Sequence, residues 1–337
     1  NPDQFELSMF SPEELFNGGS SYISYYGYDY TGSKKYKQKT DINDFFNKVD
    51  EFGDKTYNIG AYEPIYMAMY IQDKFSIKTL LFNIGLRVDR FDANQYVLKD
   101  PYLFRDAYTV GEVRGSFDSK YIPNNADDDW VVYVNRLDET LDPNNSSIVA
   151  FRDGNTWYDE NGAIVTDPTT VLGATGGPIL KNPVDKTAAS KVEGAAFEKY
   201  EPQWSVMPRL SFSFNVSNKS LFYAHYNIIT SRPTNLRLDP ISYLWIDKYG
   251  SSSSTVINNP NLKPQKSIDY EIGFRQAIGE NSAISLAAYY SEKRDQIQAY
   301  RFTGAYPTTY YSYDNIDFGT VQGFTLSYDL QRTKNVT

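Results

Sequence analysis

The residues that could carry chemistry are few, and they fall on alternating positions of extended segments. His225 is the only histidine among the 337 residues, and the chain contains no cysteine. A zinc site built on histidines or a Ser-His-Asp triad therefore cannot form within this chain. His225 shares its alternation with Tyr223 and Asn227, which favours a structural place on the polar face of a sheet over a ligand role. We expect no enzyme activity.

Three consecutive acids, Asp127, Asp128 and Asp129, are the motif that most suggests a metal. Ca²⁺ prefers clustered oxygen ligands. Such a run is more often a solvated loop, and the DGNTWYDENG segment that follows lacks the spacing of an EF-hand. We expect no cofactor and no resident metal, and calcium at Asp127–Asp129 is the weaker alternative.

The elements that position these residues are amphipathic strands. From Ser267 to Ala277 apolar side chains alternate with charged or small ones, and the pattern returns from Ser282 to Tyr290 after an Ile-Gly-Glu-Asn turn. Period-two alternation across a glycine turn predicts an antiparallel hairpin with one apolar face. The same pattern recurs at residues 80–88, 210–216, 222–228 and 316–330. Strands of about nine to eleven residues or more match the length of a tilted strand that crosses a bilayer.

Composition excludes two classes of protein. The net charge of −9 argues against a nucleic-acid partner, which needs a basic face. The sequence contains no run of about 18 apolar residues, the length that would predict a transmembrane helix. Its mean hydropathy is −0.53. A membrane-spanning barrel also looks hydrophilic on average, because only every second residue faces lipid. Aromatic residues make up 16% of the chain, as strands and membrane interfaces favour.

The connections between the strands alternate between short and long. We expect loops with short strands on the extracellular side for residues 1–64. We expect a barrel hairpin for residues 65–92 and a long extracellular excursion for residues 93–201. Residues 202–337 predict further barrel strands with extracellular loops near 230–264 and 295–312. Short turns at one end of a sheet and long loops at the other are typical of outer-membrane barrels. A soluble β sandwich or propeller is the alternative fold.

The alternation also assigns side chains to faces. The apolar set is predicted to face lipid: Phe82, Ile84, Leu86, Phe212, Phe214, Ile272, Phe274 and Leu286. The polar set is predicted to face the lumen or its rim, where a ligand would pass: Arg87, Asp89, Arg209, Tyr223, His225 and Arg232.

Several segments resemble TonB-dependent outer-membrane transporters. The quoted stretches are GAYEPIYMAMYIQDKFS, LLFNIGLRVDRFDANQ, MPRLSFSFNVSNKSLFYAHYN, NPNLKPQKSIDYEIGF and DNIDFGTVQGFTLSYDL. The YGYDYTG and FRDGNTWYDENG segments resemble the Oar-like members found in Bacteroidetes. This resemblance covers most of residues 60–332. It implies an all-β, antiparallel transmembrane barrel of about 22 strands, with a plug in its lumen.

The resemblance also sets expectations for function. It implies active import across the bacterial outer membrane, driven by the TonB complex through a plug that these residues do not contain. Outer-membrane lipid is then a partner, and a surface lipoprotein or another envelope protein is a further one. We expect an internal fragment of the barrel. The alternative is a self-contained barrel of about eight strands that serves as a surface adhesin or an envelope scaffold.

Overall fold

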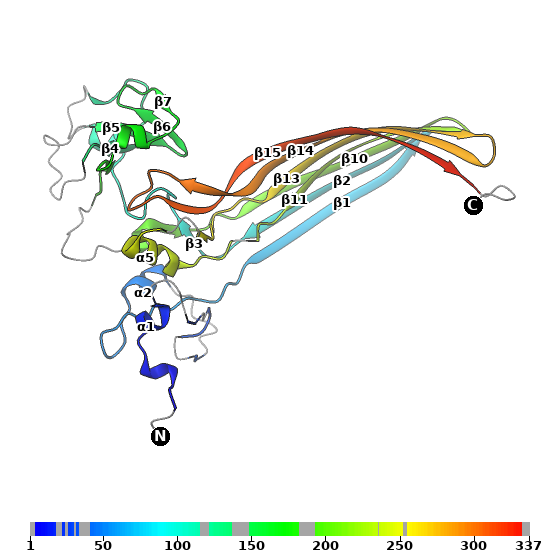
Figure 1. Cartoon of the computed structure of the whole chain (residues 1–337). Helices are drawn as coiled ribbons and strands as arrows, with labels where there is room; N and C mark the ends of the chain where they lie inside the picture. Colours follow the sequence, from blue (N-terminus) through cyan, green and yellow to red (C-terminus); the bar gives the residue numbers. More distant parts are fainter. Residues whose placement is uncertain are drawn as a thin grey trace.

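The computed structural model describes residues 4–17, 22–23, 26–29, 32–33, 41–114, 121–136, 148–181, 193–234, 236–251 and 255–331. One long, curved sheet, antiparallel except for its short edge strand, dominates the molecule (Figure 1). Its strand order is β1-β2-β10-β11-β13-β14-β15-β12. The strands are β1 (Ile65–Ile77), β2 (Leu80–Asp92), β10 (Gln203–Ser217), β11 (Ser220–Ser231), β12 (Val256–Ile257), β13 (Gln265–Ile278), β14 (Ser282–Phe302) and β15 (Tyr310–Leu330).

The hairpins of this sheet turn tightly at one end. Two residues join β1 to β2 and β10 to β11, and Gly279–Asn281 join β13 to β14. Gly279 has φ +66°, a conformation that glycine adopts without steric cost. The connections at the opposite end are long and carry most of the remaining structure.

The sheet does not close on itself. Within the described residues, no ladder joins β1 to β15, and β15 instead pairs with the short β12 in parallel. The eight-stranded closed barrel that we considered as an alternative therefore does not form from these strands. In Figure 1, β1 and β15 lie along opposite edges of the curved sheet.

The register separates the side chains into two faces. Phe75, Phe82 and Phe212 occupy paired positions on β1, β2 and β10, and the ring centroids of neighbouring members lie 5.2 and 6.4 Å apart. The row continues to Phe222 on β11 at 5.9 Å. Asp73 is the charged exception on this face of β1. The alternation predicted from sequence is therefore present as an apolar face in register across neighbouring strands.

The end with long connections carries an ordered domain. Its five-stranded sheet has the order β7-β6-β5-β4-β8, and β3 pairs separately with β9. The strands are β3 (Tyr96–Leu98), β4 (Val131–Val134), β5 (Ile148–Asp153), β6 (Thr156–Asp159), β7 (Ile164–Val165), β8 (Gly177–Pro178) and β9 (Phe197–Lys199). The helices are η1 (Leu7–Met9), α1 (Pro12–Phe16), α2 (Ile42–Asn47), α3 (Val110–Val113), α4 (Thr169–Leu172), η4 (Gly194–Ala196) and α5 (Pro240–Tyr249). None of the helices in the described ranges is long and apolar enough to cross a membrane.

A shared hydrophobic core ties this domain to the long sheet. It includes Phe16 of α1, Phe45 of α2 and Trp245 of α5, together with Phe302 of β14 and Tyr310 of β15. Burial of such large aromatic side chains contributes about 1.5–3 kcal/mol each. The loop domain is therefore packed onto the ends of the strands.

One sequence expectation needs correction here. The loop expected near 295–312 is shorter, because β14 continues to Phe302 and β15 begins at Tyr310. A bulge at Asp295, which has φ +55°, interrupts the regular pairing with β15, which resumes in the same register at Ile297. The connection expected near 230–264 has about those bounds, between Ser231 of β11 and Gln265 of β13, and it contains the ten-residue helix α5, which starts at Pro240 as helices often do.

Arg152 on β5 is a buried cation in the loop domain. Its guanidinium is 2% exposed and forms an ion pair with Asp100. It also donates to the Tyr133 hydroxyl at 3.0 Å and to the Gly154 carbonyl at 2.7 Å. The Tyr102 ring lies 4.5 Å from the guanidinium. A buried charge with this many partners fixes the conformation of the surrounding loops.

Candidate functional site

Four of the predicted lumen-facing residues meet in one recess of about 450 Å³, lined by Arg87, Asp89, Arg209 and Arg232. Arg87 donates to Asp89 at 2.8 Å and to the Tyr66 hydroxyl at 2.8 Å. The Arg232 guanidinium lies 4.3 Å from the centre of the Tyr66 ring. Three arginines against one aspartate give the recess a positive character, and planar guanidinium groups suit carboxylates and other anions.

The recess lies where two strands of the sheet separate. Pairing between β10 and β11 runs from the turn only as far as Arg209 and Asn227. The next residue of β10, Pro208, has no backbone N–H to donate, although β10 keeps its ladder with β2 up to Gln203. Pro208 therefore explains why the sheet opens beside Arg209.

The other two predicted lumen residues lie nearer the turns. The Tyr223 hydroxyl donates to Glu271 at 3.2 Å, and His225 Nε2 lies 3.6 Å from the same carboxylate. The Tyr223 ring covers Gly273, where a Cβ atom would lie 2.2 Å from the ring. The register places Tyr223 and His225 on the same face of the sheet as Arg209. Five of the six predicted residues therefore share a face by register, and Arg232, which follows the end of β11, joins Arg87, Asp89 and Arg209 at the recess.

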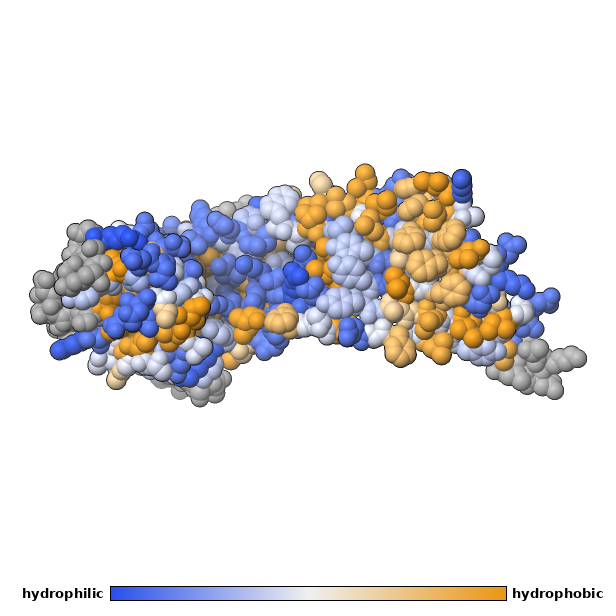
Figure 2. Space-filling model, turned by 90° about the horizontal axis from the view of Figure 1, so that it is seen from above, coloured by the Kyte–Doolittle hydropathy of each residue, from blue (hydrophilic) through white to orange (hydrophobic). Residues whose placement is uncertain are grey.

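The eight residues predicted to face lipid all lie on the opposite face of the sheet by register. Figure 2 shows apolar side chains gathered over the part of this face that ends in short turns, and hydrophilic ones toward the loop domain. Several of these side chains are exposed, such as Leu286 at 50% and Ile272 at 54%. A face this apolar needs a hydrophobic environment.

The three acids considered for calcium do not converge. Asp128 pairs with Arg114 at 2.9 Å, and the Asp127 carbonyl accepts the Trp130 N–H in a turn before β4. Within the described ranges no three acidic or histidine side chains gather in a metal-binding group. Calcium at these positions stays a prediction without geometric support.

A second cavity, of about 480 Å³, lies where the loop domain meets the strands, and we call it the rim pocket. It is formed by four segments that are far apart in the sequence: residues 58–63, 92–96, 199–202 and 237–240, with Tyr26 and α2 beside them. These segments lead into β1, leave β2, lead into β10 and follow β11. A ligand held here would sit directly above the sheet.

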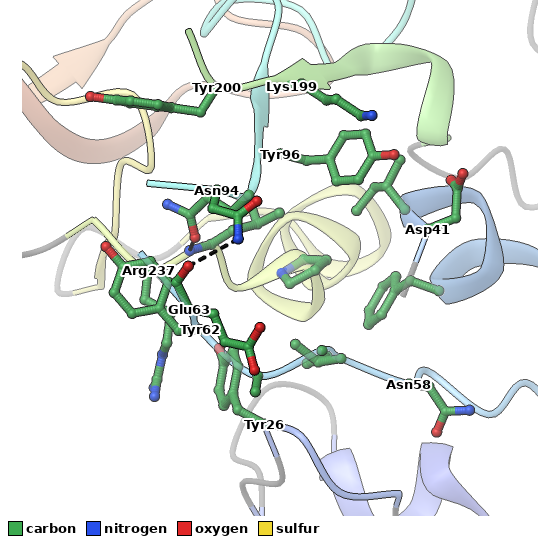
Figure 3. A pocket seen from close by; sticks show the side chains of 18 of the residues that line it. Tyr26, Asp41, Asn58, Tyr62, Glu63, Asn94, Tyr96, Lys199, Tyr200 and Arg237 are labelled. Carbon is green, nitrogen blue, oxygen red and sulfur yellow. Dashed lines mark hydrogen bonds between the residues drawn. The ribbon is translucent and has the colours of Figure 1, made fainter. Parts of the chain in front are cut away.

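Polar side chains reach the rim pocket from several sides. Figure 3 shows the phenol groups of Tyr62 and Tyr200 extending to the left of the view. The hydroxyl of Tyr96 and the ammonium of Lys199 lie to the right, and the Glu63 carboxylate lies between the two groups. Burial raises the pKa of all three tyrosines, so their hydroxyls stay protonated at neutral pH.

Two polar atoms at this pocket are buried and unsatisfied. The Tyr200 hydroxyl and the Asn58 Oδ1 have no hydrogen-bond partner within the part of the chain that the structure describes. Tyr200 is 5% exposed. Unsatisfied buried polar atoms are rare in native proteins and call for an explanation. Other atoms of both residues line the rim pocket.

Asp239 lies beside the rim pocket, next to Arg237. It accepts from Ser242 at 2.8 Å, and burial raises the pKa of its carboxyl despite hydrogen bonds from Ser242 and Tyr26. A raised folded-state pKa means that the protonated form suits the fold better. This stabilisation is complete below the ordinary carboxyl pKa and is lost as pH rises through the raised value.

We therefore expect Asp239→Asn to raise the melting temperature at pH 7, because the amide avoids burying a charge. The difference from the parent should shrink as pH falls below about 4, where both forms are neutral. Thermal unfolding of the full-length protein at several pH values measures this effect. Asp54→Asn, in an exposed turn, is the matched control, and we expect its melting temperature at pH 7 to equal that of the parent. Lower stability of Asp239→Asn at pH 7 would show that the hydrogen bonds and the attraction of Arg237 that favour the charged carboxylate outweigh its burial.

Sequence reasoning missed the rim pocket entirely. Its four tyrosines, Tyr26, Tyr62, Tyr96 and Tyr200, come from connections without a repeating pattern. The tyrosine-rich composition was a signal, but strands and membrane interfaces explained it equally well. Only the packing of the loops brings these residues together.

The two faces of the sheet, its tight turns at one end and its loop domain at the other define the wall of a transmembrane β-barrel. A family model described as TonB dependent receptor-like, beta-barrel, matches residues 3–337. The chain belongs to this family, as the resemblance predicted.

Solved structures of outer-membrane receptors are similar over most of this chain. The Serratia marcescens hemophore receptor HasR, in complex with its hemophore HasA and heme, is 13% identical over 80% of this chain and 32% of its own, with a TM-score of 0.38. The FrpB iron transporter of Neisseria meningitidis is 10% identical over 80% of this chain and 24% of its own, with a TM-score of 0.35. The alcaligin receptor FauA of Bordetella pertussis is 12% identical over 81% of this chain and 28% of its own, with a TM-score of 0.34. The chain thus spans about a quarter to a third of these proteins. No curated protein sequence matches it.

Proposed function

We propose that this chain is part of the barrel of an active importer in the bacterial outer membrane, with its long connections on the extracellular side. The observation that carries the proposal is the polar face of the sheet. It runs from Tyr223 and His225, through Arg209, to the recess around Arg87. In a closed barrel this face lines a lumen, and the apolar face meets lipid.

The remaining parts of the proposal follow from the resemblance and the open sheet. The edges of β1 and β15 leave backbone groups that further strands of a barrel of about 22 strands would pair. A plug in the lumen would face the arginines of the recess, and the TonB complex would act through that plug. A surface lipoprotein or another envelope protein would cover the loop domain. The Oar-like type from Bacteroidetes is the subgroup that we assign.

Labelling of single cysteines tests the orientation, because these 337 residues contain none. We expect Asn155→Cys, in the exposed β5–β6 turn, to react with a membrane-impermeant maleimide on intact cells. Glu280→Cys, in the turn between β13 and β14, should react only after lysis. The reverse pattern would place the loop domain in the periplasm. Equal labelling of both in intact cells would contradict a membrane-spanning sheet.

A comparison of culture media tests import without knowledge of the ligand. Cells with the full-length receptor should deplete a component that cells lacking either the receptor or TonB leave in the medium. An adhesin or scaffold would leave the medium unchanged, or would remove a component equally well without TonB. That result would replace import with surface binding.

A further inference from the structure

The recess on the polar face of the sheet carries a surplus of two positive charges. Arg87, Arg209 and Arg232 line it, and Asp89 is the only acid among the described residues that line it with them. The Asp89 carboxylate is already engaged, because it pairs with Arg87 at 2.8 Å and accepts from the Tyr66 hydroxyl. Within the described ranges, no carboxylate lies within ion-pair distance of Arg209 or Arg232. The recess therefore has two cations to offer to another molecule.

The arginines reach the recess from three separate segments. Arg87 lies on β2 and Arg209 on β10, whereas Arg232 follows the end of β11. Arg209 and Arg232 are exposed, and the side chain of Arg87 is 35% exposed. Their guanidinium groups are thus accessible to a molecule that enters the recess.

The neighbouring acid on this face does not neutralise the surplus. Asp269 of β13 pairs in register with Asn227 of β11, which lies between Asp269 and Arg209. The Asp269 carboxylate accepts from Ser267 at 3.0 Å and from Ser291. It is therefore held by hydroxyl groups on its own side of the sheet.

Tyr66 of β1 holds two of the arginines in place. Its hydroxyl accepts from Arg87 at 2.8 Å, and the centre of its ring lies 4.3 Å from the Arg232 guanidinium. The face of an aromatic ring attracts a cation at this distance. A site whose charged groups are positioned before the ligand arrives loses less conformational freedom on binding.

Size and charge identify the class of ligand. The volume of the recess, about 450 Å³, lies within the range of about 300–1,000 Å³ that is usual for small-molecule sites. The planar fork of a guanidinium matches the oxygens of a carboxylate or a phosphate. Two cations without an acid favour a ligand with two negative charges, because electrostatic complementarity selects against neutral and cationic molecules. Ser205 and Ser231, which also line the recess, add hydroxyl donors.

A second hollow, of about 360 Å³, continues from the recess toward the short turns. Arg87 and Arg209 line both spaces. Gly85 pairs with Arg209 in the register and has no side chain to fill the second hollow. An anion that leaves the recess in this direction therefore stays beside the same two arginines.

We infer that the recess binds a small oxyanion with two negative charges, of the dicarboxylate or phosphate-ester class. The inference names a substrate class for the proposed importer, and it rests on that proposal only in placing the polar face inside a lumen. Arg209 and Arg232 form the new ion pairs with the ligand. Arg87 stays paired with Asp89 and contributes its charge at the edge of the site.

Thermal unfolding of the purified full-length receptor in detergent tests this inference. The probes are inorganic phosphate, glycerol phosphate and succinate, with acetate as the singly charged comparison and chloride to keep the ionic strength constant. We expect at least one doubly charged probe to raise the melting temperature, because a ligand that binds the folded state stabilises it. Acetate should give a smaller gain.

Arg209→Gln and Arg232→Gln should each weaken binding of that probe about tenfold or more, as loss of a charged hydrogen-bonding partner does. Titration calorimetry with the same probe measures the affinity. Arg275→Gln is the matched control with unchanged affinity. Arg275 lies on the same face near the short turns, where it pairs with Asp329 at 3.3 Å outside the recess.

The same variants without any probe separate a ligand site from an internal ion pair. Arg209→Gln removes a cation without a carboxylate partner in the described part of the chain, so we expect no fall in the melting temperature. A clear fall would mean that another part of the receptor, such as a plug, supplies a carboxylate to Arg209, and would overturn the inference. Two further results would also overturn it: none of the doubly charged probes binds, or both arginine variants bind them as well as the parent does.

These results are separable from the proposed function. Binding of a doubly charged probe at the recess without TonB-dependent depletion of the medium refutes import alone. TonB-dependent depletion by a receptor whose recess binds none of the probes refutes the oxyanion site alone.

Discussion

Phe212→Arg should destabilise the folded barrel by about 2–4 kcal/mol, the cost of a cation on the lipid face near the middle of a bilayer. Phe212 lies on the apolar face, paired with Phe82 of β2 and Ala224 of β11. Its ring packs against the rings of Phe82 and Phe222. The substitution loses these contacts and places a charge where water is absent. Urea unfolding of the full-length protein in lipid vesicles measures the effect.

The matched control is Ser211→Arg, one residue away on the same strand. Ser211 lies on the polar face between Asn83 and His225. An arginine there enters the lumen, so we expect little change in the free energy of unfolding. Equal destabilisation by the two variants would contradict the assignment of the faces, and the sheet would then belong to a dry protein core.

The second large effect is expected in the loop domain, where Asp100→Asn should cost about 3–5 kcal/mol. The amide keeps the shape of the side chain and can still accept the Tyr102 N–H, which lies 2.9 Å from Asp100. It removes the only carboxylate paired with Arg152 in the described part of the chain. The buried guanidinium, 2% exposed, is then left with neutral partners. A lower melting temperature and faster hydrogen exchange in β4 and β5 are the expected readouts.

Asp128→Asn provides the comparison for an exposed ion pair. Asp128 binds Arg114, but its side chain is 76% exposed. Pairs of this kind contribute about 0–1 kcal/mol, because water and salt screen them. If Asp100→Asn is as mild as Asp128→Asn, the ring of Tyr102 and the hydroxyl of Tyr133 satisfy Arg152 without the carboxylate.

The barrel wall could be predicted from the order of the residues. Alternation is a local property, because successive side chains of a strand point to opposite faces wherever the strand lies. The assignments of Phe82, Ile272 and Leu286 to one face and of Arg87 and His225 to the other therefore needed only neighbouring residues. The short turns were equally local, since Gly279 and its neighbours mark them directly.

A bulge limits how well the ends of a strand can be predicted from alternation. Around Asp295 the pairing of β14 with β15 is irregular as far as Gln296, and it returns to its former register at Ile297 and continues to Phe302. A pattern of period two cannot distinguish such an irregularity from the end of a strand. Helix α5 was missed for a related reason. It is short, and six of its residues are buried, so it lacks a clear polar face.

Whether the sheet closes and where the two cavities lie depends on the packing of segments that are far apart in the sequence. Closure depends on whether β1 and β15 meet, and these strands are more than 200 residues apart in the sequence. The recess depends on Pro208, whose missing N–H matters only beside β11. The rim pocket requires four connections to pack together, and no local pattern records contacts between segments so far apart. Local alternation therefore determined which face each side chain takes, whereas long-range packing decided which side chains share a site.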